Sequence, residues 1–156
     1  METSIEKPET ESVDYGPLEQ SLGFLLRLAQ IRVFSRFHVT MAESSPSPGA
    51  FSVLLVIGCN AGIRQGVLAR ALAIKPANIV KLLKQFEDDG LIVRTAPLED
   101  KRAFELSLTR KGEALLRDHS AAFARHEANA HAPLTAREKD QLVSLLARFV
   151  GISGEG

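Results

Sequence analysis

Basic and amide side chains are concentrated in two segments near the middle of the 156-residue chain. The first segment runs from Lys75 to Lys84 and is predicted to be helical. The second, Thr95–Arg102, is polar and ends in Asp-Lys-Arg. Asparagine can pair with an adenine edge, and lysine and arginine bind guanine or phosphates, so these residue types suit contacts with DNA. The candidates are Lys75, Ala77, Asn78, Lys81, Lys84, Arg94, Asp100, Lys101 and Arg102. Of these, Lys75, Arg94 and Lys101 are expected to contact phosphates, which adds affinity without specificity.

Arg102 is the first of these candidates. A guanidinium at the tip of a hairpin can enter a narrow minor groove, where the negative potential is enhanced. Asp100, two residues earlier, could hold that side chain through a bidentate pair. The alternative is that these charges form a solvated helix face and a surface ion pair of little energetic value. The elements that carry the residues decide between the two interpretations.

The apolar spacing around these residues predicts two helices joined by a tight turn. The first helix spans Gln65–Ala73 and the second Pro76–Asp88, because proline is tolerated at a first helical position and Gly90 can end a helix in a left-handed conformation. The predicted buried residues are Val67, Leu68, Ala71 and Leu72 in the first helix and Ile79, Leu82, Leu83 and Phe86 in the second.

A hairpin is predicted directly after these helices. Leu91–Arg94 and Ala103–Leu108 both read as strands, and Ile63–Arg64 could pair as a third strand. Alternation along the second strand places Phe104, Leu106 and Leu108 inward, and Glu105 and Ser107 outward. A hairpin beside a helix-turn-helix is the wing of a winged helix, whose second helix can enter the major groove.

The run EDDGLIVRTAPLEDKRAFELSLTRKGEALL resembles the multiple-antibiotic-resistance regulator (MarR) family of bacterial transcription factors. That family has an Asp-x-Arg wing motif, matched by Asp100–Arg102, followed by Leu-Thr-x-x-Gly, matched by Leu108–Gly112. The resemblance extends from about Leu18 to Val150. It implies a homodimer that binds a pseudo-palindromic operator and leaves it when a small ligand binds. Many relatives have a Ser-Thr pair and an arginine where this chain has Ala77-Asn78 and Lys81, so its operator sequence should be its own.

The remaining elements are expected to flank the winged helix. Residues 1–16 are acidic and should form a mobile arm. Helices are predicted over Pro17–Thr40, over Gly49–Cys59 behind a Ser47 cap, and from Arg110 to about Ala130 behind a Thr109 cap. A last helix should follow Thr135, which forms a capping box with Glu138. The resulting fold is mostly α with a small β wing, in a single domain over 17–150. By resemblance, residues 49–109 are the winged helix, and residues 17–40 and 110–150 form a helical dimerisation region.

The resemblance also implies a ligand pocket between the dimerisation helices and the winged helix. An aromatic acid or its thioester is a typical effector of this family. Arginine or histidine side chains could bind the carboxylate, and phenylalanine rings could pack on the aromatic ring. The candidates are Phe24, Arg27, Phe34, Arg36, His38 and Phe51. Each arginine could instead be a surface or inter-subunit charge.

Composition limits the other function classes. The net charge is zero, but Ile63–Gly112 holds ten Lys and Arg against six Asp and Glu, which favours a nucleic-acid partner for this part. A single cysteine, Cys59, and the absence of an apolar run of about 20 residues predict a cytoplasmic protein without a membrane partner. No enzyme motif is present, so neither catalysis nor a cofactor is expected. His119 and His126 are seven residues apart, which does not suit a helical metal site.

The sequence thus favours a homodimeric, ligand-responsive winged-helix repressor. One alternative is a peroxide-sensing regulator that works through Cys59. Relatives of that kind have the cysteine on the first helix, whereas Cys59 ends the second, so a buried and inert thiol is the favoured interpretation. The other alternative is a winged helix that serves protein association without DNA binding.

Overall fold

The computed structural model describes residues 13–40, 46–96, 104–130 and 133–152, without the side chains of 38–40. The contacts divide the chain into two compact units, residues 1–32 and 33–156, and each is described separately. Helix α1 (Leu22–Thr40) begins in the first unit and ends in the second.

In the first unit, the expected continuous helix over 17–40 is interrupted. A 3-10 helix, η1 (Gly16–Gln20), ends at Ser21, whose backbone is extended at φ −81° and ψ 111°. The Ser21 hydroxyl then accepts a hydrogen bond from the Phe24 N–H at 3.5 Å, at the start of α1. Serine side chains commonly compete for backbone hydrogen bonds in this way, which explains why apolar spacing alone did not show the break.

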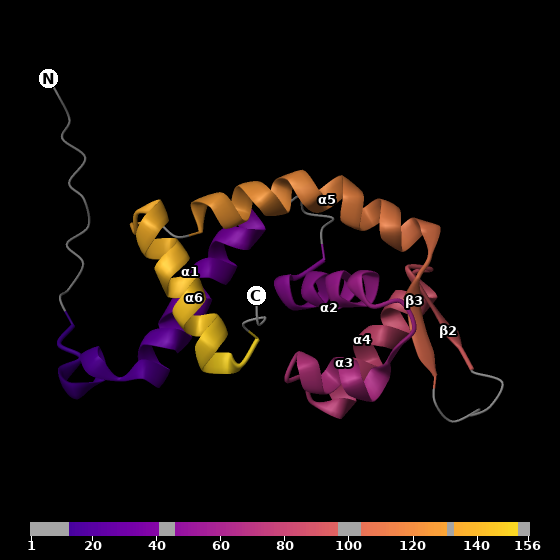
Figure 1. Ribbon diagram of the computed structural model, residues 1–156, viewed down its shortest axis with the longest axis horizontal. Helices are drawn as coiled ribbons and strands as arrows, with labels where there is room; N and C mark the ends of the chain where they lie inside the picture. Colours follow the sequence, from indigo (N-terminus) through magenta and orange to yellow (C-terminus); the bar gives the residue numbers. More distant parts are fainter. Residues whose placement is uncertain (1–12, 41–45, 97–103, 131–132, 153–156) are drawn as a thin grey trace, which may run out of the picture. The chain divides into compact units, whose positions relative to one another are not determined.

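The core of the second unit forms around α2 (Pro48–Cys59), shown in magenta in Figure 1. The Ser47 side chain accepts from the Ala50 N–H at 3.3 Å, which confirms the predicted cap. Val53, Leu54 and Ile57 are fully buried. They pack against residues of α3, α4 and the sheet in the main core cluster. This burial on several sides stabilises the helical conformation of α2 although its β-branched residues would also suit a strand.

Helices α3 (Gln65–Ala71) and α4 (Pro76–Asp88) form the predicted helix-turn-helix. In α4, Ile79, Leu83 and Phe86 are buried as expected, and Leu82 is partly buried. The predicted buried face of α3 was right for Leu68, which is fully buried, and for Leu72, which is partly buried, but wrong for Val67 and Ala71, which are exposed. Ala69 is buried in their place. The helix also ends two residues earlier than predicted.

The end of α3 is set by an unusual backbone conformation. Ala73 has φ +51°, and the Ile74 N–H donates to the Ala69 carbonyl at 2.9 Å. This is the pattern in which a residue after the helix, usually glycine, takes the left-handed conformation. At the end of α4, Gly90 takes that role at φ +70°, as predicted. No sequence signal marked Ala73, since alanine rarely adopts this conformation.

Strands β1 (Ile63–Arg64), β3 (Glu105–Leu108) and β2 (Ile92–Thr95) form an antiparallel sheet in that order within the described residues. Ile63 pairs with Leu106, which confirms the third strand. Leu106 is fully buried, but Phe104 lies before the strand and is 47% exposed, so its inward placement was wrong. The hairpin segment between the strands, residues 97–103, lies outside the described residues.

Helix α5 (Arg110–Asn129) leads away from the wing, and α6 (Ala136–Val150) follows. Both predicted caps are confirmed: Thr109 accepts from the Gly112 N–H, and Thr135 and Glu138 form a capping box. A second cluster of buried side chains lies where α2 and α5 meet the end of α1. There Phe51 packs on Phe37 and Phe123, with ring centroids 6.2 and 5.1 Å apart.

Candidate nucleic-acid interface

The exposed face of α4 carries the predicted base-reading residues. Ala77, Asn78, Lys81 and Lys84 are all exposed, and so is Lys75, the residue that precedes the helix. The buried residues of α4 fix the rotation of the helix, because they dock one face into the core. The remaining surface of the helix is therefore presented to solvent, with Asn78, Lys81 and Lys84 as its polar side chains beside the small Ala77.

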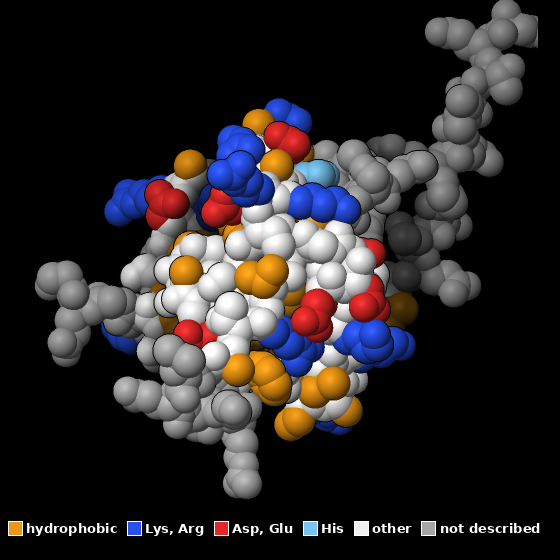
Figure 2. All heavy atoms as spheres, turned by 90° about the vertical axis from the view of Figure 1, so that its right-hand side faces the viewer, with side chains coloured by type: hydrophobic (Ala, Val, Ile, Leu, Met, Phe, Trp, Pro, Cys, Tyr) orange, Lys and Arg blue, Asp and Glu red, His pale blue; other side chains and the backbone are white. Residues whose placement is uncertain are grey.

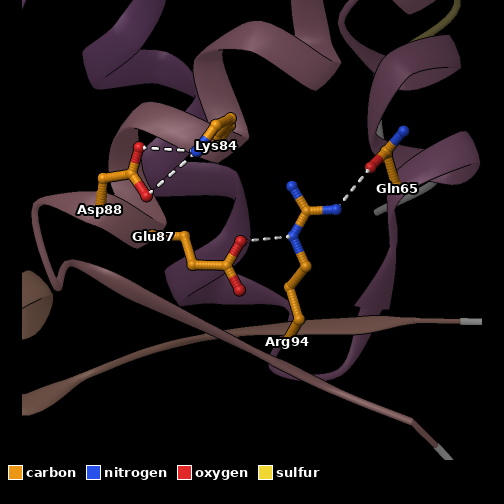
Figure 3. Close-up of polar contacts among 5 residues, drawn as sticks. All are labelled: Gln65, Lys84, Glu87, Asp88 and Arg94. Carbon is orange, nitrogen blue, oxygen red and sulfur yellow. Dashed lines mark hydrogen bonds and ion pairs between the residues drawn. The ribbon is translucent and has the colours of Figure 1, made fainter.

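Lys84 has a partner on the same helix. Its Nζ lies 3.0 and 3.3 Å from the two Asp88 carboxylate oxygens, in an i, i+4 pair that is largely exposed (Figure 3). Such exposed pairs contribute little and exchange readily with other partners. Neither Lys75 nor Lys81 is in an ion pair with another described residue.

Arg94 of β2 lies between the two helices of the helix-turn-helix. Its Nε is 3.1 Å from Glu87 Oε2 in the last turn of α4, and its Nη1 donates to Gln65 Oε1 in the first turn of α3 at 3.3 Å. Figure 3 shows the guanidinium between these two partners. Only 21% of the Arg94 side chain is exposed. These residues lie as far as 29 positions apart, and no signal in the sequence pairs them.

The start of α5 is bonded to the turn between α4 and β2. Lys111 Nζ donates to the Asp89 carbonyl at 2.7 Å, the Thr109 hydroxyl to the Gly90 carbonyl at 2.6 Å, and the Thr109 N–H to the Leu91 carbonyl at 3.0 Å. Gly112 is buried against the same turn. The Leu-Thr-x-x-Gly motif thus joins the end of the predicted recognition helix to α5.

Three of the predicted contact residues, Asp100, Lys101 and Arg102, lie outside the described residues. The strands on either side are described up to Ala96 and from Phe104. Figure 2, which faces the wing side, shows basic and acidic side chains interspersed on the described surface. On the described part of this face, positive charge is therefore carried by individual side chains and not by a broad basic patch.

The predicted ligand-binding residues fall in both units. Phe24, which packs on Tyr15 with ring centroids 5.5 Å apart, and the exposed Arg27 belong to the first unit. In the second unit, Phe34 is exposed, Arg36 Nη1 donates to the Asn129 carbonyl at 3.1 Å, and Phe51 is buried in the second cluster. His38 lies within α1, and its side chain is outside the described part.

The expectation of a buried Cys59 was wrong. The thiol lies at the exposed end of α2, where Gly58 and Asn60 are exposed as well. The helix buries its residues at positions 53, 54 and 57, so position 59 falls on the other face. Among the described residues, no three His, Cys, Asp or Glu side chains form a group that could hold a metal ion. No described helix is long and apolar enough to cross a membrane.

The chain is similar to known regulators over most of its length. Residues 47–104 match the model of the MarR family. A putative transcriptional regulatory protein for the hcr operon of Thauera aromatica is 35% identical over 136 residues, which cover 86% of this chain and 82% of that protein. A probable transcriptional regulator from Pseudomonas aeruginosa is 31% identical, with a TM-score of 0.77 over 85% of this chain and 98% of that one.

Two solved structures of the transcriptional repressor CouR are similar as well. One is bound to a 23-mer DNA duplex and is 37% identical, with a TM-score of 0.81 over 89% of this chain and 99% of that one. The other is bound to p-coumaroyl-CoA and is 36% identical, with a TM-score of 0.78 over 89% of this chain and 98% of that one. With the winged helix described above, these similarities show that the chain belongs to the MarR family of transcriptional regulators.

Proposed function

We propose that this regulator is a repressor that binds a pseudo-palindromic DNA operator as a homodimer and leaves it when a small aromatic acid or its coenzyme A thioester binds. The observation that carries the proposal is the similarity of this chain to CouR, which covers nearly the whole length of CouR. One of the two CouR structures is bound to DNA and the other to p-coumaroyl-CoA.

The orientation of α4 supports DNA binding. Its exposed face presents Asn78 and Lys81 beside the small Ala77, which leaves room for a base edge to approach. Lys75 and Lys84 would bind phosphates. In this proposal, the wing tip with Asp100, Lys101 and Arg102 reads the adjacent minor groove. The winged helix would span residues 49–109, behind an acidic arm at 1–16.

The apolar surface of α6 supports the homodimer. Leu142, Leu145 and Phe149 follow one another at helical spacing and are all exposed, as is Val150. A helix with an uncovered apolar face of this kind needs a partner surface. A second copy of the chain would supply it, with residues 17–40 and 110–150 forming the interface, and a symmetric dimer would match the two halves of a pseudo-palindrome.

The first test is a mobility shift on the DNA that flanks the protein's own gene, at several salt concentrations. We expect a shifted band that weakens steeply with salt, because binding releases counterions from the phosphates. Aromatic acids and their coenzyme A thioesters, including p-coumaroyl-CoA, are then added singly. One of them should abolish the shift; a shift insensitive to all of them would refute the effector class but keep the DNA-binding role.

The exposure of Cys59 makes the peroxide-sensor alternative worth a direct test. In that alternative, peroxide releases the wild-type protein from DNA and the Cys59→Ser variant no longer responds. We expect both proteins to bind DNA equally with and without peroxide. If no DNA fragment is shifted at any salt concentration, the association-module alternative replaces the repressor.

A further inference from the structure

We propose that Arg94 is a positioning residue, which fixes the direction of the wing relative to the recognition helix and does not itself bind a DNA phosphate. This inference rests on the proposed DNA binding. It gives Arg94 a different role from the phosphate contact expected from its charge and position alone.

Arg94 already has two partners within the protein. One side of its guanidinium faces the Glu87 carboxylate at 3.1 Å and another donates to the Gln65 amide oxygen at 3.3 Å (Figure 3). A phosphate that approached Nη1 would have to displace Gln65, and one that approached Nε would meet the Glu87 carboxylate. The neighbouring carboxylate also offsets part of the positive charge that a phosphate would meet.

Arg94 lies on the outer strand of the described sheet. Strand β2 is an edge strand, with β3 as its neighbour in the described sheet. Ile92 anchors it in the core, but Val93 and Thr95 are exposed, and Ala96 is exposed just before the hairpin tip. Arg94 therefore supplies a polar tie between the outer part of β2 and the two helices. Without it, the strand would keep its ladder to β3 but lose this constraint.

The planar guanidinium of Arg94 also suits it to hold two partners. Guanidinium donors lie in one plane and point in fixed directions, so one arginine can hold two partners at a defined angle. The two partners stand at the ends of different helices, in the last turn of α4 and the first turn of α3. A single side chain thus adds a directed tie from the wing to both helices of the helix-turn-helix. Lysine, with a compact charge on a flexible stem, would keep the charge but not the angle.

The test compares variants on a DNA fragment that the wild-type protein shifts and on a scrambled fragment of the same composition. For Arg94→Ala we expect about a tenfold loss of affinity for the specific fragment, within the range of interactions between contacting residues. The slope of log affinity against log salt should stay unchanged. A lost phosphate contact would instead reduce that slope by about 0.9 for each phosphate and weaken both fragments alike.

Replacing the partner Glu87 with alanine should change DNA affinity in opposite directions in the two interpretations. In the positioning role, Glu87→Ala lowers specific affinity, and the Glu87→Ala/Arg94→Ala double variant is little worse than either single one. If Arg94 binds phosphate, Glu87→Ala strengthens binding, because a negative charge near DNA is removed. Asp88→Ala is the matched control: it removes a carboxylate from the same helix turn without contacting Arg94, and it should not lower affinity.

The Arg94→Lys variant keeps the positive charge but loses the planar set of donors, so it shows which of the two DNA affinity depends on. It should behave like Arg94→Ala if the residue positions the wing, and like the wild type if it binds phosphate as a point charge. Active protein in each preparation is counted by stoichiometric titration, so that poorly folded material is not mistaken for weak binding. A wild-type protein that shifts no DNA overturns the proposed function itself; a wild-type shift with a reduced salt slope in Arg94→Ala overturns only the positioning role.

Discussion

Replacing Gly112 with alanine should destabilise the junction between α4, β2 and α5. Gly112 lies in the first turn of α5, and a Cβ at this position would collide with the Leu91 carbonyl oxygen. It would also lie 3.1 Å from the Leu91 carbonyl carbon and 3.2 Å from Leu108 Cδ2. The main obstacle is backbone, which no side-chain rotation can relieve.

The magnitude follows from what must move. Shifting the start of α5 strains the hydrogen bonds from Thr109 and Lys111 to the turn, each with a net value of about 0.5–1.5 kcal/mol. Overpacking of this kind costs about 1–3 kcal/mol, and the better helix propensity of alanine returns about 1 kcal/mol. With about 1 kcal/mol added for the weakened hydrogen bonds, we expect a net loss of about 1–3 kcal/mol, or roughly 2–12 °C in Tm for a chain of this size.

The assay is thermal and urea unfolding of wild type and variant at the same protein concentration, because the stability of the proposed dimer would depend on concentration. Gly49→Ala in α2 is the matched control, since its added Cβ would meet no atom within 4 Å. That variant should match or slightly exceed wild-type stability. If Gly112→Ala unfolds at the wild-type Tm while the control behaves as expected, the close packing against Leu91 is not a constraint on the fold.

Three further predictions concern DNA binding, assembly and pH. Arg102→Ala should lower operator affinity at least about tenfold in a mobility shift while the dimer stays intact; wild-type affinity would exclude the wing contact. Phe149→Asp, at a side chain that is 65% exposed, should convert dimers to monomers in sedimentation; an unchanged dimer would exclude α6 from the interface. The pKa of Glu138 lies below its ordinary value of 4.5 because the Thr135 N–H and hydroxyl donate to the carboxylate. The stabilisation is therefore present above pH 4.5 and lost as pH falls below it. Glu138→Gln should be less stable than wild type near pH 7, and this difference in stability should disappear in acid. A difference that does not change with pH would contradict the assignment to the Glu138 carboxylate.

The secondary structure could be predicted closely where its signals are local. The bounds of α4 follow from Pro76, the apolar spacing and Gly90. The capping box of Thr135 and Glu138 joins residues only three apart. The helix break at Ser21 and the left-handed Ala73 were missed, because both residues adopt conformations that their types only sometimes favour.

The candidate site was predictable only in part. The residue types and spacing of α4 determine that Lys81 stands opposite its buried face and that Asn78 flanks that face, because a helix repeats every 3.6 residues. Charge alone assigned Arg94 to a phosphate, and only the tertiary structure brings it to Glu87 and Gln65. Burial shows the same limit, since Val67 and Phe104 were predicted inside and lie exposed. Periodicity along the chain determines which side chains share a face, but which faces meet, and which charges pair, depends on contacts between elements far apart in sequence.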